Sequence, residues 1–127
     1  MARAAFGREK PGFFSRPKSN KHGSRGVHAD GHYFRSGREH KRYLQLKLMQ
    51  QAGVISFLKP GPKWDIEVAG VWITSYTADF SYVEDGKLVV EDVKSKWTLK
   101  MRAAQEFQIK ARLMEAVHSI IVKVVVM

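Results

Sequence analysis

The C-terminal third of the chain most constrains the fold. Residues 88–94 form a strand-like segment that is apolar on both faces at its start, as is typical of a central sheet strand. Residues 98–118 are helical by composition, and residues 119–126 are almost wholly β-branched, which predicts a buried strand. The apolar stripe of the helix consists of Ala104, Phe107, Ala111 and Met114. Because a helical crossover leads into this last strand, it should pair in parallel with an earlier strand, which predicts an α/β fold.

Turn and cap signals place the elements upstream. Asp30-Gly31 predicts a tight hairpin over residues 27–34. Ser36 and Glu39 form a capping-box pattern that begins a helix over residues 38–52, which ends at Gly53. We expect strands over residues 54–58, 64–68 and 71–83, turns at 69–70 and 84–87, and a loop at 59–62. The predicted order of the main elements is therefore α-β-β-β-α-β.

Composition excludes several classes of protein. The chain has 127 residues and a mass of 14.5 kDa, enough for one domain. Cysteine is absent, so any metal must be bound by oxygen or imidazole, and disulfides and cysteine nucleophiles are excluded. No apolar run approaches the length of about 20 residues that a membrane helix needs, and the first residues lack the apolar core of a signal peptide. These features predict a cytoplasmic protein.

The net charge of +10 indicates a polyanionic partner. Residues 1–26 contain seven of the 22 Lys and Arg residues and one of the 12 acids. Pro, Gly and Ser interrupt this segment, and it has no apolar periodicity. We therefore predict a flexible basic arm over residues 1–26 and a folded domain over residues 27–127. A solvated arm that serves only solubility is the alternative.

Four titratable residues occupy places that favour a shared site. Asp92 and Lys94 are two positions apart in one predicted strand, so their side chains leave the same face of the sheet. Asp79 lies inside the preceding predicted strand, across a short turn, and Glu39 lies in the first turn of the first helix. Oxygen ligands of this kind suit Mg²⁺, which takes one or two carboxylates and completes its shell with water and substrate phosphate.

Together with the element order, these residues resemble the PD-(D/E)XK nuclease superfamily, whose signature is an acid, a spacer and then acid-x-Lys. Here the signature is Asp79 followed by Asp92-Val93-Lys94, with Ala78 in place of the proline of the superfamily's name. From about residue 19 onward the chain also resembles a family of small phage-encoded proteins that are described as nucleases related to Holliday-junction resolvases. The segments that carry this narrower resemblance are Asn20-Lys21-His22-Gly23, Asp30-Gly31, Ser36 to Glu39, Tyr76 to Phe80 and Leu88 to Lys94.

The resemblance implies a restriction-endonuclease-like α/β core and Mg²⁺-dependent hydrolysis of DNA phosphodiester bonds, with Mn²⁺ as a substitute. In the superfamily's pattern, Asp79, Asp92 and the Val93 carbonyl bind Mg²⁺, and Glu39 ligates a second ion directly or through water. Lys94 orients or helps to deprotonate the attacking water. Kinship with resolvases further implies branched DNA as the substrate, a homodimer, and a phage protein in the cytoplasm of a bacterial host.

Structural explanations stay open for each of these residues. Glu39 also fits a capping box with Ser36. Asp79 could instead form a salt bridge with Lys94, and Asp92 could form a structural pair with the same lysine. Glu91 should point to the opposite face of the sheet from Asp92, where we expect it to contact a basic residue of a packed helix.

Basic residues flank the predicted acidic site, as DNA binding requires, because they offset repulsion between the carboxylates and the phosphates. We expect DNA contacts from Arg25, Arg38, Lys96, Lys100, Arg102 and Lys110. A non-catalytic nucleic-acid-binding protein with the same fold is the main alternative function. A structural or regulatory protein whose arm binds a protein partner is another.

Overall fold

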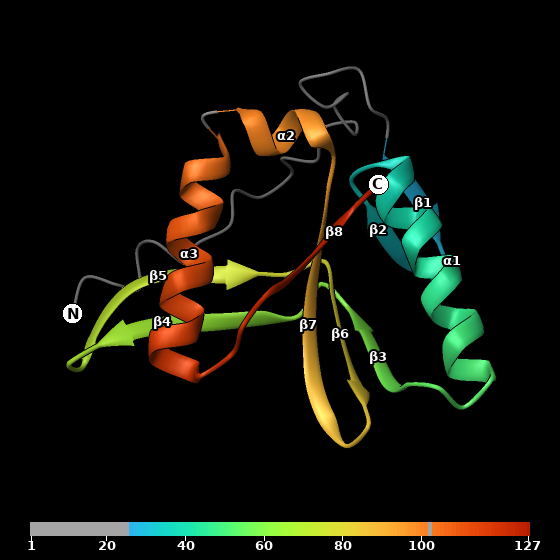
Figure 1. The fold of residues 1–127 in the computed structure, drawn as a ribbon, viewed down its shortest axis with the longest axis horizontal. Helices are drawn as coiled ribbons and strands as arrows, with labels where there is room; N and C mark the ends of the chain where they lie inside the picture. The colour runs from blue at the N-terminus through green and yellow to red at the C-terminus, as the bar shows by residue number, and fades with distance from the viewer. Residues whose placement is uncertain (1–25, 102) are drawn as a thin grey trace, which may run out of the picture.

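The computed structural model describes residues 26–101 and 103–127, so almost all of the predicted arm, with Arg25, and also Arg102 lie outside the described residues. Within these ranges the chain forms a mixed α/β structure (Figure 1). The elements are β1 (Val27–Ala29), β2 (His32–Phe34), α1 (Gly37–Gln51), β3 (Ser56–Pro60), β4 (Lys63–Val68), β5 (Val71–Thr77), β6 (Phe80–Glu84), β7 (Lys87–Lys94), α2 (Lys96–Lys100), α3 (Ala103–His118) and β8 (Lys123–Val126).

The central sheet has four strands in the order β3-β6-β7-β8. β6 pairs antiparallel with β3 and β7, whereas β7 and β8 pair in parallel, with Asp92 opposite Val124. The parallel pairing predicted for the C-terminal strand is therefore confirmed. The strand itself is shorter than the predicted range 119–126, because the chain after α3 becomes extended and paired only at Lys123.

Three tight turns connect antiparallel strand pairs. Asp30-Gly31 joins β1 to β2, Ala69-Gly70 joins β4 to β5, and Asp85-Gly86 joins β6 to β7. Both residues of each turn have positive φ, the backbone conformation that fits the twist of a two-residue hairpin. All three predicted turns are confirmed. The pairs β1-β2 and β4-β5 form two-stranded sheets outside the central sheet.

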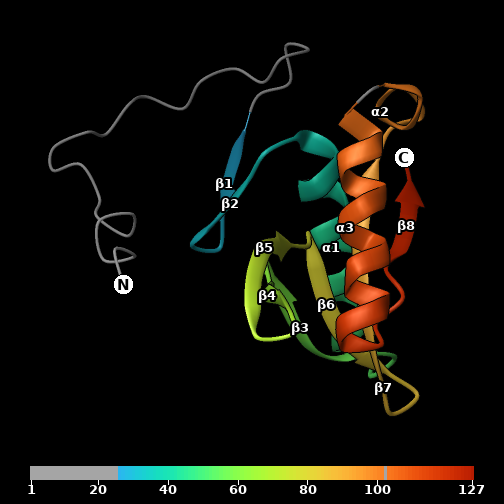
Figure 2. The same ribbon diagram turned by 90° about the vertical axis from the view of Figure 1, so that its left-hand side faces the viewer.

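The two faces of the central sheet carry separate core clusters. Tyr43 and Leu46 of α1 pack with Phe80, Tyr82 and Val93 on one face. On the other face, Met114 of α3 packs with Val90 of β7 and with side chains of the β4-β5 hairpin. Figure 2 shows α3 in front of the central strands, with β1-β2 standing to one side. Alternate residues of β7 thus point toward different helices.

The structure corrects two predicted elements. The expected strand over residues 71–83 is interrupted at Ala78-Asp79, where β5 ends and β6 begins, so Asp79 is not inside a strand. Main-chain hydrogen bonds from another segment hold this corner: the Gly61 N–H donates to the Asp79 carbonyl at 2.9 Å, and the Ala78 N–H donates to the Pro62 carbonyl at 2.9 Å. Gly61 has φ +66°, a backbone conformation that favours glycine.

The second correction concerns residues 98–118, which were expected to form one helix. They form parts of two helices, α2 and α3. Ser95 caps the short helix α2 by accepting a hydrogen bond from the Thr98 N–H at 3.0 Å. Met101 then adopts an extended conformation with ψ 162°, which ends α2 before α3 begins. A smaller difference concerns β3, which extends to Pro60, whereas a loop was expected over residues 59–62. None of the helices within the described ranges has the length and apolar character needed to span a bilayer.

Candidate functional site

Asp79 and Asp92 lie on neighbouring strand ends and position each other. The Asp79 N–H donates to Asp92 Oδ1 at 3.0 Å, and the Val93 N–H donates to Asp79 Oδ2 at 2.8 Å. Both aspartates are buried, with relative exposures of 8% and 2%. Backbone donors on β7 and at the start of β6 therefore hold the two carboxylates in a defined relative orientation.

Tyr76 completes the surroundings of Asp92. Its hydroxyl donates to Asp92 Oδ2, and the tyrosine itself is buried on β5. Asp92 thus accepts a hydrogen bond at each carboxylate oxygen. Because a carboxylate oxygen has two lone pairs, one position on each oxygen is still able to accept a further ligand.

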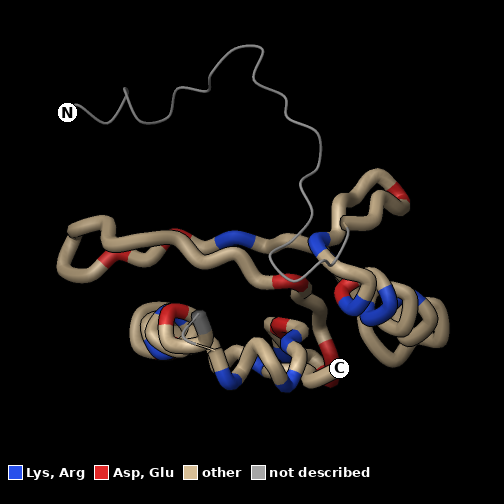
Figure 3. The backbone as a smooth tube through the Cα atoms, turned by 90° about the horizontal axis from the view of Figure 1, so that it is seen from above, with Lys and Arg blue, Asp and Glu red and all other residues tan. Residues whose placement is uncertain are grey.

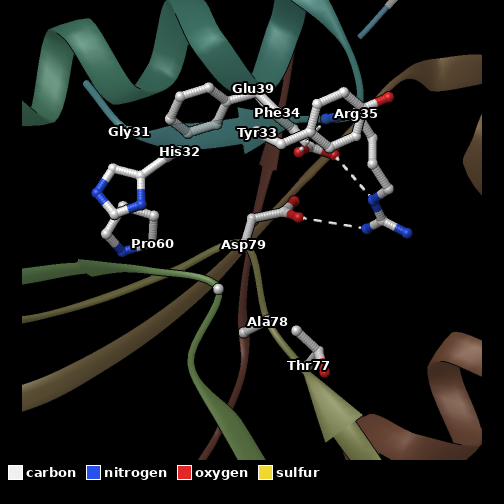
Figure 4. A pocket seen from close by; sticks show the side chains of 11 residues that line it. Gly31, His32, Tyr33, Phe34, Arg35, Glu39, Pro60, Thr77, Ala78 and Asp79 are labelled. Atoms are coloured by element: carbon white, nitrogen blue, oxygen red, sulfur yellow. Dashed lines mark hydrogen bonds and ion pairs between the residues drawn. The ribbon is translucent and has the colours of Figure 1, made fainter. Parts of the chain in front are cut away.

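Glu39 combines a capping role with a position beside Asp79. Its N–H donates to the N-cap Ser36 Oγ at 3.2 Å, as the capping-box pattern predicted. Its carboxylate reaches back and accepts from the Arg35 N–H at 3.2 Å, one residue before the cap. The Arg35 guanidinium then bridges the acids, with Nε 3.6 Å from Glu39 Oε1 and Nη2 3.5 Å from Asp79 Oδ1 (Figure 4).

Burial shapes the protonation of all three acids. Desolvation raises the pKa of Asp79 and of Asp92, and hydrogen bonds from the Val93 and Asp79 N–H groups oppose that rise. Desolvation also raises the pKa of Glu39, and the negative charge of Asp79 raises it further. The two aspartates thus repel the Glu39 carboxylate, and Arg35 offsets part of this repulsion. Such a site favours binding of additional positive charge.

Lys94 extends from the same face of β7 as Asp92. Its Nζ lies 4.4 Å from the centroid of the Phe107 ring of α3, and its positive charge lowers the pKa of both aspartates. Among the described residues it forms no ion pair within 4.0 Å with either aspartate, so both alternative pairings of Lys94 are wrong. Arg35 takes the place that the sequence had suggested for Lys94 beside Asp79.

Glu91 points away from this site, as predicted. Its carboxylate pairs with the guanidinium of Arg42 on α1, at 2.6 Å from Nε and 3.0 Å from Nη2, and it accepts from the Tyr82 hydroxyl at 2.6 Å. Glu91 is fully buried. The hydrogen bond to Glu91 raises the pKa of Arg42, and the contact between the two side chains anchors α1 to β7.

An open pocket gives access to Asp79 and Glu39, whereas Asp92 is not among its lining residues. It has a volume of about 520 Å³ and is lined by Glu39, Arg35 and Asp79, by residues of β2, and by the corner at Pro60-Gly61. In Figure 4 the Asp79 carboxylate and the Arg35 guanidinium both project into this space. A substrate group can therefore reach Asp79 and Glu39 from solvent.

The predicted DNA-contacting residues have different surroundings. Lys96 and Lys100 are exposed on α2, which directly follows Lys94. Lys110 on α3 is partly buried and lies 3.8 Å from Glu106, while Arg38 is half-buried in the first turn of α1. Figure 3 shows basic positions on the helices at both sides of the central strands and acidic positions among them. Arg25 and Arg102 fall outside the described residues.

The donor set fits a hard divalent cation. Asp79, Asp92, the Val93 carbonyl and Glu39 offer only oxygen atoms, and the two aspartates are close enough to share main-chain hydrogen bonds. Within residues 26–101 and 103–127, no group of three or more His, Asp or Glu side chains stands ready as a complete cation site. Mg²⁺ commonly takes one or two carboxylates and completes its shell with water and substrate phosphate.

The sequence did not predict the contacts that Arg35 and Tyr76 make with the acids of the site. Arg35 is four positions before Glu39, and this i, i+4 spacing of opposite charges was the signal that could have revealed the pair. Tyr76 carried no such signal. Its contact with Asp92 spans 16 residues and depends on the interruption between β5 and β6.

Comparison of the sequence with known families assigns the chain to one of them. Residues 19–125 match the model of the family described as "Protein of unknown function (DUF1064)". The chain belongs to this family. The DUF1064 match begins where the resemblance noted from the motifs begins, and it includes the three acids and Lys94. No curated protein and no solved structure gives a significant match.

Proposed function

We propose that this DUF1064 protein is a Mg²⁺-dependent DNA endonuclease with a restriction-endonuclease-like core. The observation that carries the proposal is the coupling of Asp79 to Asp92 through main-chain hydrogen bonds, with Lys94 on the same strand face as Asp92. An acid at a strand start and an acid-x-Lys triplet on the adjacent strand are the pattern of the PD-(D/E)XK signature noted above.

The order of elements supports the same assignment. Apart from the hairpins β1-β2 and β4-β5, the chain runs α1-β3-β6-β7, then through α2 and α3 to β8. This is the α-β-β-β-α-β order expected of the superfamily. The parallel β7-β8 pair is reached by the helical crossover, and Asp92 lies on the central strand β7.

Each residue has a separate role in phosphodiester hydrolysis. Asp79, Asp92 and the Val93 carbonyl would hold the cation, and Glu39 would hold a second one directly or through water. Mg²⁺, or Mn²⁺ in its place, supplies Lewis acidity toward the scissile phosphate. The Lys94 ammonium would orient the attacking water and offset negative charge on the transition state.

The charge of the chain supports DNA as the substrate. Its net charge is +10, and Lys96 and Lys100 are exposed next to Lys94. These lysines can bind backbone phosphates on either side of the bond that is cut. Branched DNA is the proposed preference, because a chain this small has little surface for reading a sequence. Symmetric cutting of a branch would require a homodimer.

Cleavage of labelled DNA tests the proposal. Purified full-length protein is incubated with a four-way junction or with a matched linear duplex, in Mg²⁺ or in EDTA. We expect Mg²⁺-dependent cutting with preference for the junction. Asp92→Asn should remove it, because the carboxylate charge is lost while an acceptor for the Asp79 N–H is kept. Asp65→Asn, on an exposed acid of β4, is the control that should cut normally.

Binding without cutting would overturn the enzymatic part of the proposal. If the wild-type protein retained DNA but cut nothing in Mg²⁺ or Mn²⁺, the non-catalytic binding function would take its place. If it failed to retain DNA even at low salt, a protein-binding role would be favoured.

A further inference from the structure

Trp97 of α2 is a large aromatic side chain that the folded domain leaves in contact with solvent. It is 78% exposed, whereas Trp72 of β5 is 49% exposed and Trp64 of β4 is partly buried against a core cluster. Tryptophan is highly buried on average in folded proteins. The packing of the domain therefore does not account for the indole at this position.

Hydrogen bonds hold the backbone that carries Trp97. At the start of α2, the N-cap Ser95 accepts from the Thr98 N–H, and the two hydroxyl oxygens lie 2.8 Å apart. The Leu99 N–H donates to the Ser95 carbonyl at 3.2 Å, and the Met101 N–H donates to the Thr98 carbonyl at 3.2 Å. The indole is thus presented to solvent by a capped helical turn.

Trp97 lies close to the proposed cleavage site along the chain. Figure 1 shows α2 directly after the end of β7, where Lys94 lies. Three residues separate Lys94 from Trp97, so their Cα atoms are no more than about 11 Å apart. A phosphate at Lys94 and a base at Trp97 would therefore belong to nucleotides only a few positions apart in one strand.

The neighbours of Trp97 are basic. Lys96 and Lys100 are both exposed, and neither forms an ion pair with an acid in the part of the chain that the structure describes. Lysines attract backbone phosphates, and an exposed aromatic ring stacks on the flat face of a base. In a fully paired duplex the neighbouring bases cover these faces, so stacking needs a base that has left the helical stack.

We propose that Trp97 stacks on an unpaired base of the bound DNA, close to the bond that is cut, while Lys96 and Lys100 bind the adjoining phosphates. The inference rests on the proposed function, since it takes DNA as the ligand. It also makes that function more specific, because the feature recognised is an unpaired base, which a branch point, a bulge or a single-stranded gap can expose.

Binding of two matched DNA ligands to the full-length protein tests the stacking. One is a duplex with a short thymine bulge, the other is fully paired with the same flanking sequence, and both are measured by fluorescence anisotropy in EDTA to prevent cutting. We expect Trp97→Ala to weaken binding of the bulged duplex about tenfold and that of the paired duplex less than about twofold. Trp72→Ala, on an exposed tryptophan of β5, should bind both like the wild type.

Two further variants separate stacking from simple apolar contact. Trp97→Phe keeps a flat ring and should retain most of the preference for the bulge, whereas Trp97→Leu is apolar without a ring and should behave like Trp97→Ala. Equal binding by the leucine and phenylalanine variants would overturn the stacking.

Fluorescence of Trp97 itself provides an independent measurement. The chain has three tryptophans, so replacing Trp64 and Trp72 by phenylalanine leaves Trp97 as the sole emitter. Its emission should be quenched by acrylamide in the absence of DNA and by oligothymidine when this single strand binds. Weak quenching by acrylamide would show that another segment or a second copy covers the ring, and would overturn the proposal.

The outcomes distinguish this inference from the proposed function. If the wild type retains DNA and Trp97→Ala loses affinity for both duplexes equally, or for neither, the stacking is overturned while DNA binding stands. If the wild type binds DNA but cuts nothing in Mg²⁺, only the enzymatic proposal fails, because binding in EDTA decides the role of Trp97. If the wild type retains no DNA even at low salt, both proposals fail.

Discussion

The backbone N–H of Asp79 donates to the carboxylate of Asp92 at 3.0 Å, so the side chain of one acid positions the main chain at the other. The Val93 N–H returns a bond of 2.8 Å to Asp79. These bonds hold two buried carboxylates next to each other, near the start of β6 and the end of β7. The arrangement is useful for binding a cation, but it is costly for the folded protein alone.

Replacement of Asp92 by asparagine should stabilise the protein. Burial raises the pKa of Asp92, so the ionised carboxylate costs folding free energy at neutral pH. We expect Asp92→Asn to raise the free energy of unfolding at about pH 7 by on the order of 1 kcal/mol, measured by urea denaturation. Asp65→Asn, at an exposed site, should leave it nearly unchanged.

The gain from Asp92→Asn should depend on pH. The folded-state pKa of Asp92 lies above its value of 3.8 in the unfolded chain, so the folded state binds the proton more tightly. The cost of the ionised group is therefore fully present above the folded pKa and disappears as pH falls toward 3.8. The difference between variant and wild type should shrink on acidification. A difference that stays constant between about pH 7 and about pH 4 would contradict this explanation.

Removal of Arg42 should destabilise the fold strongly. The Arg42 side chain is 14% exposed and pairs with a Glu91 side chain that is fully buried, so Arg42→Ala would leave an unpaired buried charge. We expect a loss of about 3 kcal/mol in the free energy of unfolding. The double variant with Glu91→Gln should lose less than the sum of the two single variants, because the charge is removed together with its partner.

The ion pair between Lys47 and Asp30 provides the matched comparison on the same helix. Its two side chains are 36% and 49% exposed, although the contact is short at 2.7 Å. Lys47→Ala should lower the free energy of unfolding in urea denaturation far less than Arg42→Ala does, because solvent screens this exposed pair. A loss equal to that of Arg42→Ala would show that burial is not what separates the two pairs.

Replacement of Lys94 by methionine should separate activity from stability. The aliphatic stem can still pack on Phe107, and the contact of Nζ with the ring contributes only about 1 kcal/mol. DNA cleavage should fall by about a hundredfold or more, because the positive charge beside the two aspartates is lost. Lys87→Met at the far end of β7 should cut normally. Undiminished cleavage by Lys94→Met would exclude a catalytic role for this lysine.

The α2 lysines should contribute to the salt dependence of DNA binding. If Lys100 contacts one phosphate, Lys100→Ala should reduce the slope of log affinity against log salt concentration by about 1. Fluorescence anisotropy over a range of salt concentrations measures this slope. Lys87→Ala should leave it unchanged, and an unchanged slope for Lys100→Ala would remove α2 from the DNA-binding surface.

Local sequence patterns predicted the structure correctly where residues close in the sequence decide the backbone conformation. Asp30-Gly31, Ala69-Gly70 and Asp85-Gly86 predicted three turns, because few residue pairs adopt positive φ at both positions. The two-residue period of a strand separated Glu91 from Asp92 and predicted a basic partner for Glu91.

Long-range contacts decided what local patterns could not. Residues 71–83 are all compatible with a strand, but the strand is interrupted at Ala78-Asp79, where Gly61 and Pro62 form hydrogen bonds with the corner. That corner turns the Asp79 carboxylate toward Arg35 and Glu39, about 40 residues earlier in the chain. Lys94, which the sequence allowed beside Asp79, packs on Phe107 instead.

The sequence by itself thus determined the three turns, the capped start of the first helix, the parallel pairing of the last strand and the opposite facing of Glu91 and Asp92. Only the tertiary structure decided which cation neutralises Asp79 and Glu39, where the long strand breaks, and which tyrosine binds Asp92. Turn conformation and strand period depend on residues within a few positions of one another. The partner of a buried carboxylate depends on which distant segments the packed core brings within hydrogen-bonding distance.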